Sequence, residues 1–233
     1  MKTTFLGILI LYSQIVFAQQ GIPKSTNKIP GLEKSNLHVP ARVITSEPGY
    51  HWFGYYDKLQ FDPTNRFVLG MKTEFEGRSP KPEDEITIGM VDLHKNDKWI
   101  ELGNSKAWGW QQGCMLQFVP GNDSLVIWND RTEGKFVSHL YNIYTSEEKI
   151  LPFAIYALSP DGIHAVTTDF ERIQDTRPGY GYAGTPDPNR DNLAPENAGI
   201  YLCNLQTGEK KLIITYRQMA QKHMLTDDPS NKI

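Results

Sequence analysis

The sequence predicts an all-β fold, a β-propeller made of four-stranded antiparallel blades. Three segments repeat the same pattern of a short strand, a proline-containing turn and a second strand, and each is followed by another pair of strands. The repeat intervals, 57 residues from Phe61 to Phe118 and 40 residues from Phe118 to Leu158, suit units of one blade. No convincing helical periodicity interrupts them. A β-sandwich has similar strand spacing, but internal repetition favours the propeller.

The predicted blades follow one another along the chain. We expect the first over residues 50–103, the second over 108–152 and the third over 153–215. In each blade, two short strands are joined through a proline-containing turn, and a second pair follows. Short turns separate the strands of each second pair: Asn96-Asp97, Thr145-Ser146 and Thr207-Gly208.

Three blades do not close a propeller, because four to eight blades are needed to cover every blade face. Residues 41–46, with 42–45 at their centre, form a predicted lone strand that would complete the last blade of a ring. Residues 216–233 are either a polar tail or the start of a missing blade. The sequence therefore predicts an incomplete ring, the amino-terminal fragment of a larger propeller. The alternative is a complete small protein that self-associates into a ring.

The amino-terminal segment is typical of a secretory signal peptide. Met1-Lys2 gives a basic start, residues 5–17 are an apolar run, and small residues precede a cleavage site after Ala18. A membrane anchor, the alternative, needs about 20 apolar residues, and Gln14 interrupts this run. Cleavage would release the protein, without a membrane span, into the periplasm or the medium. Residues 19–40, which contain three prolines, are expected to be an extended lead-in.

Charge and motifs exclude several classes of function. With 24 Lys and Arg against 27 Asp and Glu, the net charge is −3, which provides no general attraction for nucleic acid. The six histidines form no pattern typical of a metal site, and no nucleophile elbow, P-loop or dinucleotide-binding motif is present. Cys114 and Cys203 fall on different blades, so we expect two separate buried thiols; a disulfide between them is the alternative.

Two aromatic segments at the start of predicted inner strands are candidates for a ligand-binding surface at the channel mouth. Residues 51–58 combine rings with ionisable groups. These groups could stack on a ligand and direct polarity or protons, or they could pack between blades. Residues 108–113 offer the same two interpretations: Gln111 and Gln112 could bind sugar hydroxyls, while the two tryptophans are more typical of a core.

An insertion of 27 residues, 171–197, separates the second and third strands of the third blade. Loops of this length in compact domains are usually lids or binding loops. Arginines and tyrosines on a glycine-rich backbone suit an acidic or carbohydrate ligand, and packing against a neighbouring blade is the alternative. The candidate substrate-binding residues of the whole chain are His51, Tyr55, Asp57, Lys58, Gln111, Gln112, Arg172, Asp175, Arg177, Tyr180 and Tyr182.

The order of these features resembles the oligogalacturonate lyase family. The points of resemblance are the lone strand at 42–45, the segment His51…Tyr55-Tyr56-Asp57-Lys58, the long charged insertion and the strand region 200–209, over about residues 41–215. The resemblance implies a seven-bladed propeller that cleaves short pectin-derived uronates by β-elimination, which needs a base and a cation for the developing charge. It also implies Mn²⁺ in the full-length protein. The metal ligands and catalytic His and Arg of that family lie on later blades, so no catalytic residue is assigned here.

Two functions from different classes follow. The first is the front part of an exported uronate lyase, with His51, Lys58, Arg172 and Arg177 on the substrate side and an acidic oligosaccharide as ligand. Without the catalytic blades, this chain alone is expected to be inactive. The second is a non-catalytic propeller module, resembling the periplasmic TolB-type repeats, that binds a protein or a glycan.

Overall fold

The computed structural model describes residues 41–46 and 48–222. The chain divides into two compact units, residues 1–47 and 48–233. The predicted signal peptide (1–18), the lead-in (19–40) and the last part of the tail (223–233) lie outside the described residues. Residues 41–46 have no regular secondary structure. The lone strand expected there would complete a last blade that is not among the three described here, so it stays a prediction. A strand is defined by hydrogen bonds to a partner strand, and residues 41–46 make no such ladder.

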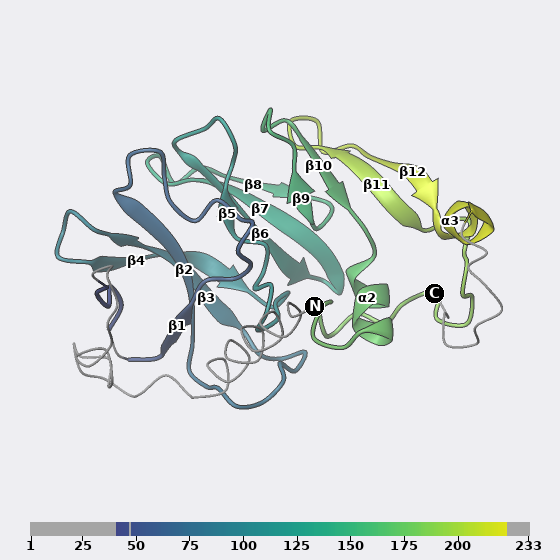
Figure 1. Ribbon diagram of the computed structural model, residues 1–233, viewed down its shortest axis with the longest axis horizontal. Helices are drawn as coiled ribbons and strands as arrows, with labels where there is room; N and C mark the ends of the chain where they lie inside the picture. Colours follow the sequence, from purple (N-terminus) through teal and green to yellow (C-terminus); the bar gives the residue numbers. More distant parts are fainter. Residues whose placement is uncertain (1–40, 47, 223–233) are drawn as a thin grey trace, which may run out of the picture. The chain divides into compact units, whose positions relative to one another are not determined.

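The second unit contains three four-stranded sheets, each an antiparallel meander in which neighbours in sequence are neighbours in the sheet (Figure 1). This confirms the predicted all-β fold of four-stranded antiparallel blades. The first sheet consists of β1 (Tyr50–Trp52), β2 (Phe67–Thr73), β3 (Ile86–Asp92) and β4 (Lys98–Ser105). The second consists of β5 (Gln117–Phe118), β6 (Leu125–Thr132), β7 (Lys135–Asn142) and β8 (Glu148–Leu151). The third consists of β9 (Ala157–Leu158), β10 (His164–Thr167), β11 (Gly199–Asn204) and β12 (Lys210–Thr215).

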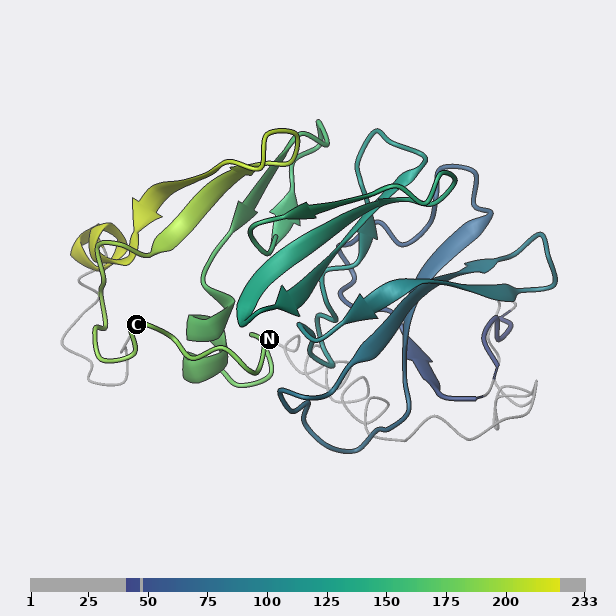
Figure 2. The same cartoon turned by 180° about the vertical axis from the view of Figure 1, so that it is seen from behind.

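Successive sheets pack through apolar faces, as propeller blades do (Figure 2). Side chains alternate between the two faces of each strand, so one face of the second sheet meets the first sheet and the other meets the third. Val126 and Trp128 belong to the apolar cluster shared with the first sheet. Ile127, which lies between them, belongs to the cluster shared with the third sheet. The core therefore lies between blades, and we refer to the sheets as blades 1, 2 and 3.

The innermost strand of blade 1 differs from the prediction. Phe61, the reference residue of the first predicted repeat, makes only a single bridge to Val68, and β1 instead pairs with the end of β2. Residues 53–60 leave the sheet between these two contacts. There Gly54 approaches blade 2 so closely that a β-carbon on it would lie 2.6 Å from the carbonyl oxygen of Gln112. We call residues 53–58, the part of this segment that lies against blade 2, the bulge.

Two short helices were not predicted. Helix α2 (Phe170–Thr176) begins the insertion, and helix α3 (Tyr216–Lys222) follows blade 3. Helix α3 starts with a reciprocal capping box: the Gln218 amide N–H donates to the Thr215 hydroxyl, and the Thr215 amide N–H donates to the Gln218 side chain. Periodicity could not reveal seven-residue helices, which are stabilised by caps and tertiary contacts rather than by a long apolar stripe.

Both cysteines are free and buried, which confirms the expectation of two separate thiols. Burial raises the pKa of the Cys203 thiol to about 11 and raises that of Cys114 further. Neither thiol is therefore a reactive thiolate at neutral pH. Among the described residues, no helix has the length and apolar character needed to cross a bilayer.

Candidate functional site

One end of the blades gathers the long connections. In an antiparallel meander, the connection between the second and third strands and the connection that leaves the fourth strand emerge at the same end of the sheet. That end therefore carries residues 74–85, 106–116, 152–156 and the insertion, together with the start of β1. The bulge of residues 53–58 is held against residue 112 of the same group. Most of the candidate residues lie in these segments.

Asn129 fixes the connection between blades 2 and 3. Its side-chain amide donates to the carbonyl of Ile155 and to the hydroxyl of Tyr182, at 2.8 and 2.9 Å. Its oxygen accepts hydrogen bonds from the Ile155 amide and from the Ser138 hydroxyl, both at 2.8 Å. Asn129 is fully buried, and both atoms of its amide group are satisfied. Because Asn129 holds both backbone groups of Ile155, the position of Tyr156, which follows Ile155 in the chain, is well defined.

Four tyrosines from three segments lie near one another, and we call Tyr55, Tyr56, Tyr156 and Tyr180 the tyrosine cluster. The rings of Tyr55 and Tyr56 are 4.6 Å apart at an angle of 37°, and Tyr56 is 88% exposed. The pKa of the Tyr55 phenol is raised, chiefly by Tyr56 and to a lesser degree by the phenols of Tyr180 and Tyr156. The tyrosine cluster thus joins the bulge of blade 1, the start of blade 3 and the insertion.

Two polar side chains, Lys58 and Gln112, form hydrogen bonds to Tyr156 of the tyrosine cluster. The Lys58 ammonium donates to the Tyr156 carbonyl at 3.1 Å and to the Asp57 carboxylate at 3.2 Å. Gln112 donates from its amide nitrogen to the Tyr156 hydroxyl at 3.2 Å. The amide oxygen of Gln112 is buried and has no hydrogen-bond partner, and the whole residue is only 5% exposed. An unsatisfied buried amide oxygen costs about 1–3 kcal/mol.

The loop that carries Gln112 is tightly folded. Gly109 and Gly113 exchange backbone hydrogen bonds of 3.1 and 2.8 Å, which closes residues 109–113 into a compact turn. Met115 follows in the left-handed region, with φ of 57°, a strained conformation for a non-glycine residue. A β-carbon on Gly109 would lie 3.0 Å from the Gly179 carbonyl oxygen, so the insertion lies directly against this loop.

Arg177 provides the exposed cation of this surface. Its guanidinium carbon lies 3.7 Å from the centre of the Tyr180 ring, in a cation–π contact. Arg177 is exposed, and Tyr180 is partly exposed. Gln111, next to Gln112, is exposed as well. A stacked guanidinium is pre-organised to meet an anionic group, because the ring restricts its motion.

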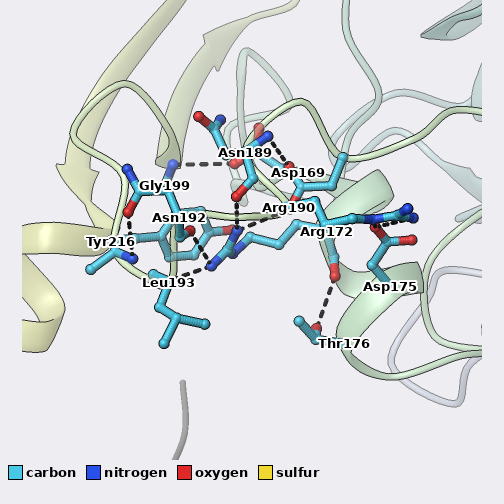
Figure 3. A network of polar contacts seen from close by, with 12 residues as sticks. Asp169, Arg172, Asp175, Thr176, Asn189, Arg190, Asn192, Leu193, Gly199 and Tyr216 are labelled. Carbon is cyan, nitrogen blue, oxygen red and sulfur yellow. Dashed lines mark hydrogen bonds and ion pairs between the residues drawn. The ribbon is translucent and has the colours of Figure 1, made fainter.

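Arg172 has a different role from the substrate contact expected of it (Figure 3). It is buried, and its guanidinium pairs with the Asp187 carboxylate at 2.9 Å. The same group donates to the carbonyls of Asn189, Asn192 and Leu193. All of these acceptors belong to the insertion, so Arg172 holds the insertion in one conformation.

Three other candidate residues lie away from the tyrosine cluster or within the core. Tyr182 is buried, stacked on Phe170 with ring centres 4.3 Å apart. Asp175 pairs with Arg190 at 2.8 Å. His51 lies on β1 with its ring at 5.0 Å from that of Trp99, and burial together with Lys72 lowers its pKa.

The structure therefore brings together Tyr55, Lys58, Gln112 and Tyr180 of the candidate residues, with Asp57, Gln111 and Arg177 beside them. Sequence reasoning missed Tyr156, which contacts both Lys58 and Gln112. The signal was available, because Tyr156 immediately precedes the inner strand β9.

The Mn²⁺ site implied by the resemblance has no counterpart in the part of the chain that the structure describes. Within residues 41–46 and 48–222, no group of three or more His, Cys, Asp or Glu side chains is placed to hold a metal ion. The resemblance places the metal ligands on later blades, so Mn²⁺ in the full-length protein stays a prediction.

The solved structures that the chain resembles include the following two. The fold is similar to that of TolB from Acinetobacter baumannii, with 11% identity and a TM-score of 0.44, over 76% of this chain and 35% of TolB. It is also similar to that of the isopeptidase AtxE2 in its apo form, with 9% identity and a TM-score of 0.39, over 76% of this chain and 31% of AtxE2. The chain thus spans about a third of the length of each protein. No protein-family model and no curated protein matches the sequence.

Proposed function

We propose that this chain is part of an exported β-propeller that binds a ligand at the tyrosine cluster without transforming it. The observation that carries the proposal is the Gln112 side chain: one atom of its amide group is bonded to Tyr156, and the other is buried without a partner. Native proteins rarely leave such an atom unsatisfied. A ligand hydroxyl that displaces the groups covering this atom would satisfy it in either orientation of the amide, because a hydroxyl both donates and accepts.

The surrounding groups indicate the chemistry of the ligand. Tyr56 and Tyr180 offer ring faces, which pack on the apolar faces of sugars, and hydroxyls, which bond at the edges. Arg177 is an exposed cation already stacked on Tyr180, suited to a carboxylate. Rings, an amide and a guanidinium together favour an acidic oligosaccharide.

Binding without catalysis is favoured over the lyase interpretation because the cations expected on the substrate side are occupied. Arg172 makes its contacts within the insertion, and Lys58 bonds Asp57 and Tyr156. Stabilising a developing enolate needs a cation free to meet it at the reacting carbon. Arg177 is exposed, and the contact that positions it is with the Tyr180 ring.

Calorimetric titration tests the proposal. Oligogalacturonate should bind more tightly than a neutral oligosaccharide of the same length, and Arg177→Ala should weaken that binding by about 1–3 kcal/mol. Arg190→Ala is the matched control, because Arg190 lies in the same insertion and pairs with Asp175; it should leave the affinity unchanged. Equal affinity of the two variants and the wild type would contradict the proposed surface. Ultraviolet absorbance should show no unsaturated product, and its appearance would restore the lyase interpretation.

Export is the remaining part of the proposal, and it rests on the signal-peptide pattern at residues 1–18. Amino-terminal sequencing of the protein from the periplasm or the medium should begin at Gln19. An intact amino terminus in the cytoplasm would contradict export.

A further inference from the structure

Two side chains of β6 join blade 2 to the end of β4 in blade 1. Trp128 is 1% exposed, and its indole N–H donates to the Asn104 carbonyl at 3.1 Å. The Asp130 carboxylate accepts a hydrogen bond of 2.7 Å from the amide of Lys106, the residue that follows β4. Residues 106–116 begin at this joint. We call the contacts of Trp128 with Asn104 and of Asp130 with Lys106 the β4 anchor.

His139, on the neighbouring strand β7, contacts both of the β6 side chains in the β4 anchor. Its ring is stacked on that of Trp128, with centres 5.1 Å apart and planes at 5°. Its Nε2 atom lies 3.3 Å from the Asp130 carboxylate, and its Nδ1 atom lies 2.7 Å from the Glu148 carboxylate on β8. Only 13% of the His139 side chain is exposed. Both ring nitrogens of a mostly buried histidine therefore face carboxylate oxygens.

This geometry suits the imidazolium. The protonated ring donates to both carboxylates, whereas the neutral ring has one N–H and presents a lone pair to the other carboxylate. A positive ring also interacts favourably with the face of an indole. Burial lowers the pKa of His139, but Asp130 and Glu148 outweigh burial and raise the pKa above 6.5. In the described part of the chain, these two carboxylates are the charged groups that act on the ring; the Lys106 ammonium lies 3.7 Å from the Glu85 carboxylate.

We propose that protonation of His139 sets the strength of the β4 anchor, so that the joint between blades 1 and 2 is firmer in acid than in alkaline solution. When the proton leaves, the shorter contact keeps the remaining N–H on Nδ1, toward Glu148. Nε2 then turns a lone pair toward Asp130 and repels the carboxylate that holds the Lys106 amide. Because the pKa is raised in the folded state, the added stability is fully present below pH 6.5 and disappears as the pH rises through the folded value. The inference is independent of the proposed ligand.

Amide exchange of the unliganded protein tests the proposal, measured by nuclear magnetic resonance and corrected for the intrinsic effect of pH. The protection factor of the Lys106 amide should be about three- to fivefold higher at pH 5.5 than at pH 8.5. The control is the amide of Ile143, which donates to the Ser124 carbonyl at the other end of blade 2 and should be equally protected at both values. Equal protection of Lys106 at both values, or an equal change at Ile143, would overturn the proposal.

Two variants separate the effect of the proton from that of the side chains. His139→Gln carries no charge in this range, so the protection of Lys106 should be the same at both pH values and close to that of the wild type at pH 8.5. Asp130→Asn keeps an oxygen that accepts from the Lys106 amide, and its side-chain N–H can donate to a neutral ring. Protection in this variant should not fall as the pH rises. A fall that persists in either variant would mean that another group controls the β4 anchor, and would overturn the proposal.

Discussion

The guanidinium of Arg172 lies 2.9 Å from the carboxylate of Asp187, and both side chains are almost fully buried. The two residues are separated along the chain by most of helix α2 and by the loop that carries Arg177 and Tyr180. The pair therefore fixes the span that contributes Arg177 and Tyr180 to the proposed binding surface. A buried pair of this kind makes the insertion an ordered part of blade 3.

Replacing Arg172 with methionine should destabilise the protein by about 3–5 kcal/mol, because it leaves the Asp187 carboxylate buried and unpaired. Urea unfolding followed by circular dichroism measures the change. The control is Arg190→Met, which breaks the more exposed pair with Asp175 and should cost no more than about 1 kcal/mol. Equal costs for the two variants would mean that the buried pair does not hold the insertion.

Asn129 should be the most sensitive polar position in the core of blade 2. Asn129→Ala removes four hydrogen bonds and leaves the N–H and the C=O of Ile155 without the partners they have now. We therefore expect the free energy of unfolding to fall by about 3–5 kcal/mol. Ser138→Ala removes a hydroxyl with two partners, Asn129 and the Phe153 carbonyl, and should cost about 1–2 kcal/mol. Thermal unfolding distinguishes them. A smaller loss for the asparagine variant would contradict the role given to this network.

Gly54→Ala tests the contact between blade 1 and the loop of Gln112. The new β-carbon would lie 2.6 Å from a backbone oxygen, so the two segments must separate. Ligand affinity should fall at least tenfold in titration calorimetry. Gly121→Ala is the matched control: φ there is +72°, so it costs about 1–2 kcal/mol of stability, but nothing lies within 4 Å of the new atom. Its affinity should equal that of the wild type.

His139 should make the stability of blade 2 depend on pH. Burial lowers the pKa of His139, but hydrogen bonds and charge from Asp130 and Glu148 outweigh burial, so the pKa lies above 6.5. A raised pKa in the folded state gives a stabilisation that is complete below pH 6.5 and is lost as the pH rises through the folded value. A double-mutant cycle of His139→Gln and Glu148→Gln should give a coupling of up to about 1 kcal/mol at pH 5.5 and a smaller coupling at pH 8.5. Equal coupling at both values would contradict this ion pair.

The blades could be predicted from sequence because the pattern of a short strand, a proline-containing turn and a second strand occurs three times, each time followed by another pair of strands. The innermost strand of blade 1 could not be placed, because its position depends on the contact of Gly54 with Gln112, two residues on different blades. Helix α3 had a readable signal in Thr215 and Gln218, the two ends of a capping box.

The candidate site was predictable in part for a similar reason. The aromatic segments 51–58 and 108–113 flank inner strands and lie at the end where the long connections meet, and Tyr55 and Gln112 were found in this way. The role of Arg172 could not be found, because its partner Asp187 lies within an irregular segment whose path no periodicity reveals. An arginine in a long loop looks the same in sequence whether it meets a ligand or a buried carboxylate.

Hydrogen–deuterium exchange with and without oligogalacturonate tests the central claim most directly, that segments from all three blades form one binding surface. Peptides covering residues 53–58, 109–113, 154–157 and 177–182 should all exchange more slowly when the ligand is bound. Peptides of the turns at the opposite end of the blades, such as residues 95–97 and 144–147, should be unaffected. Protection of only one of the four segments, or of the opposite turns instead, would contradict a shared surface.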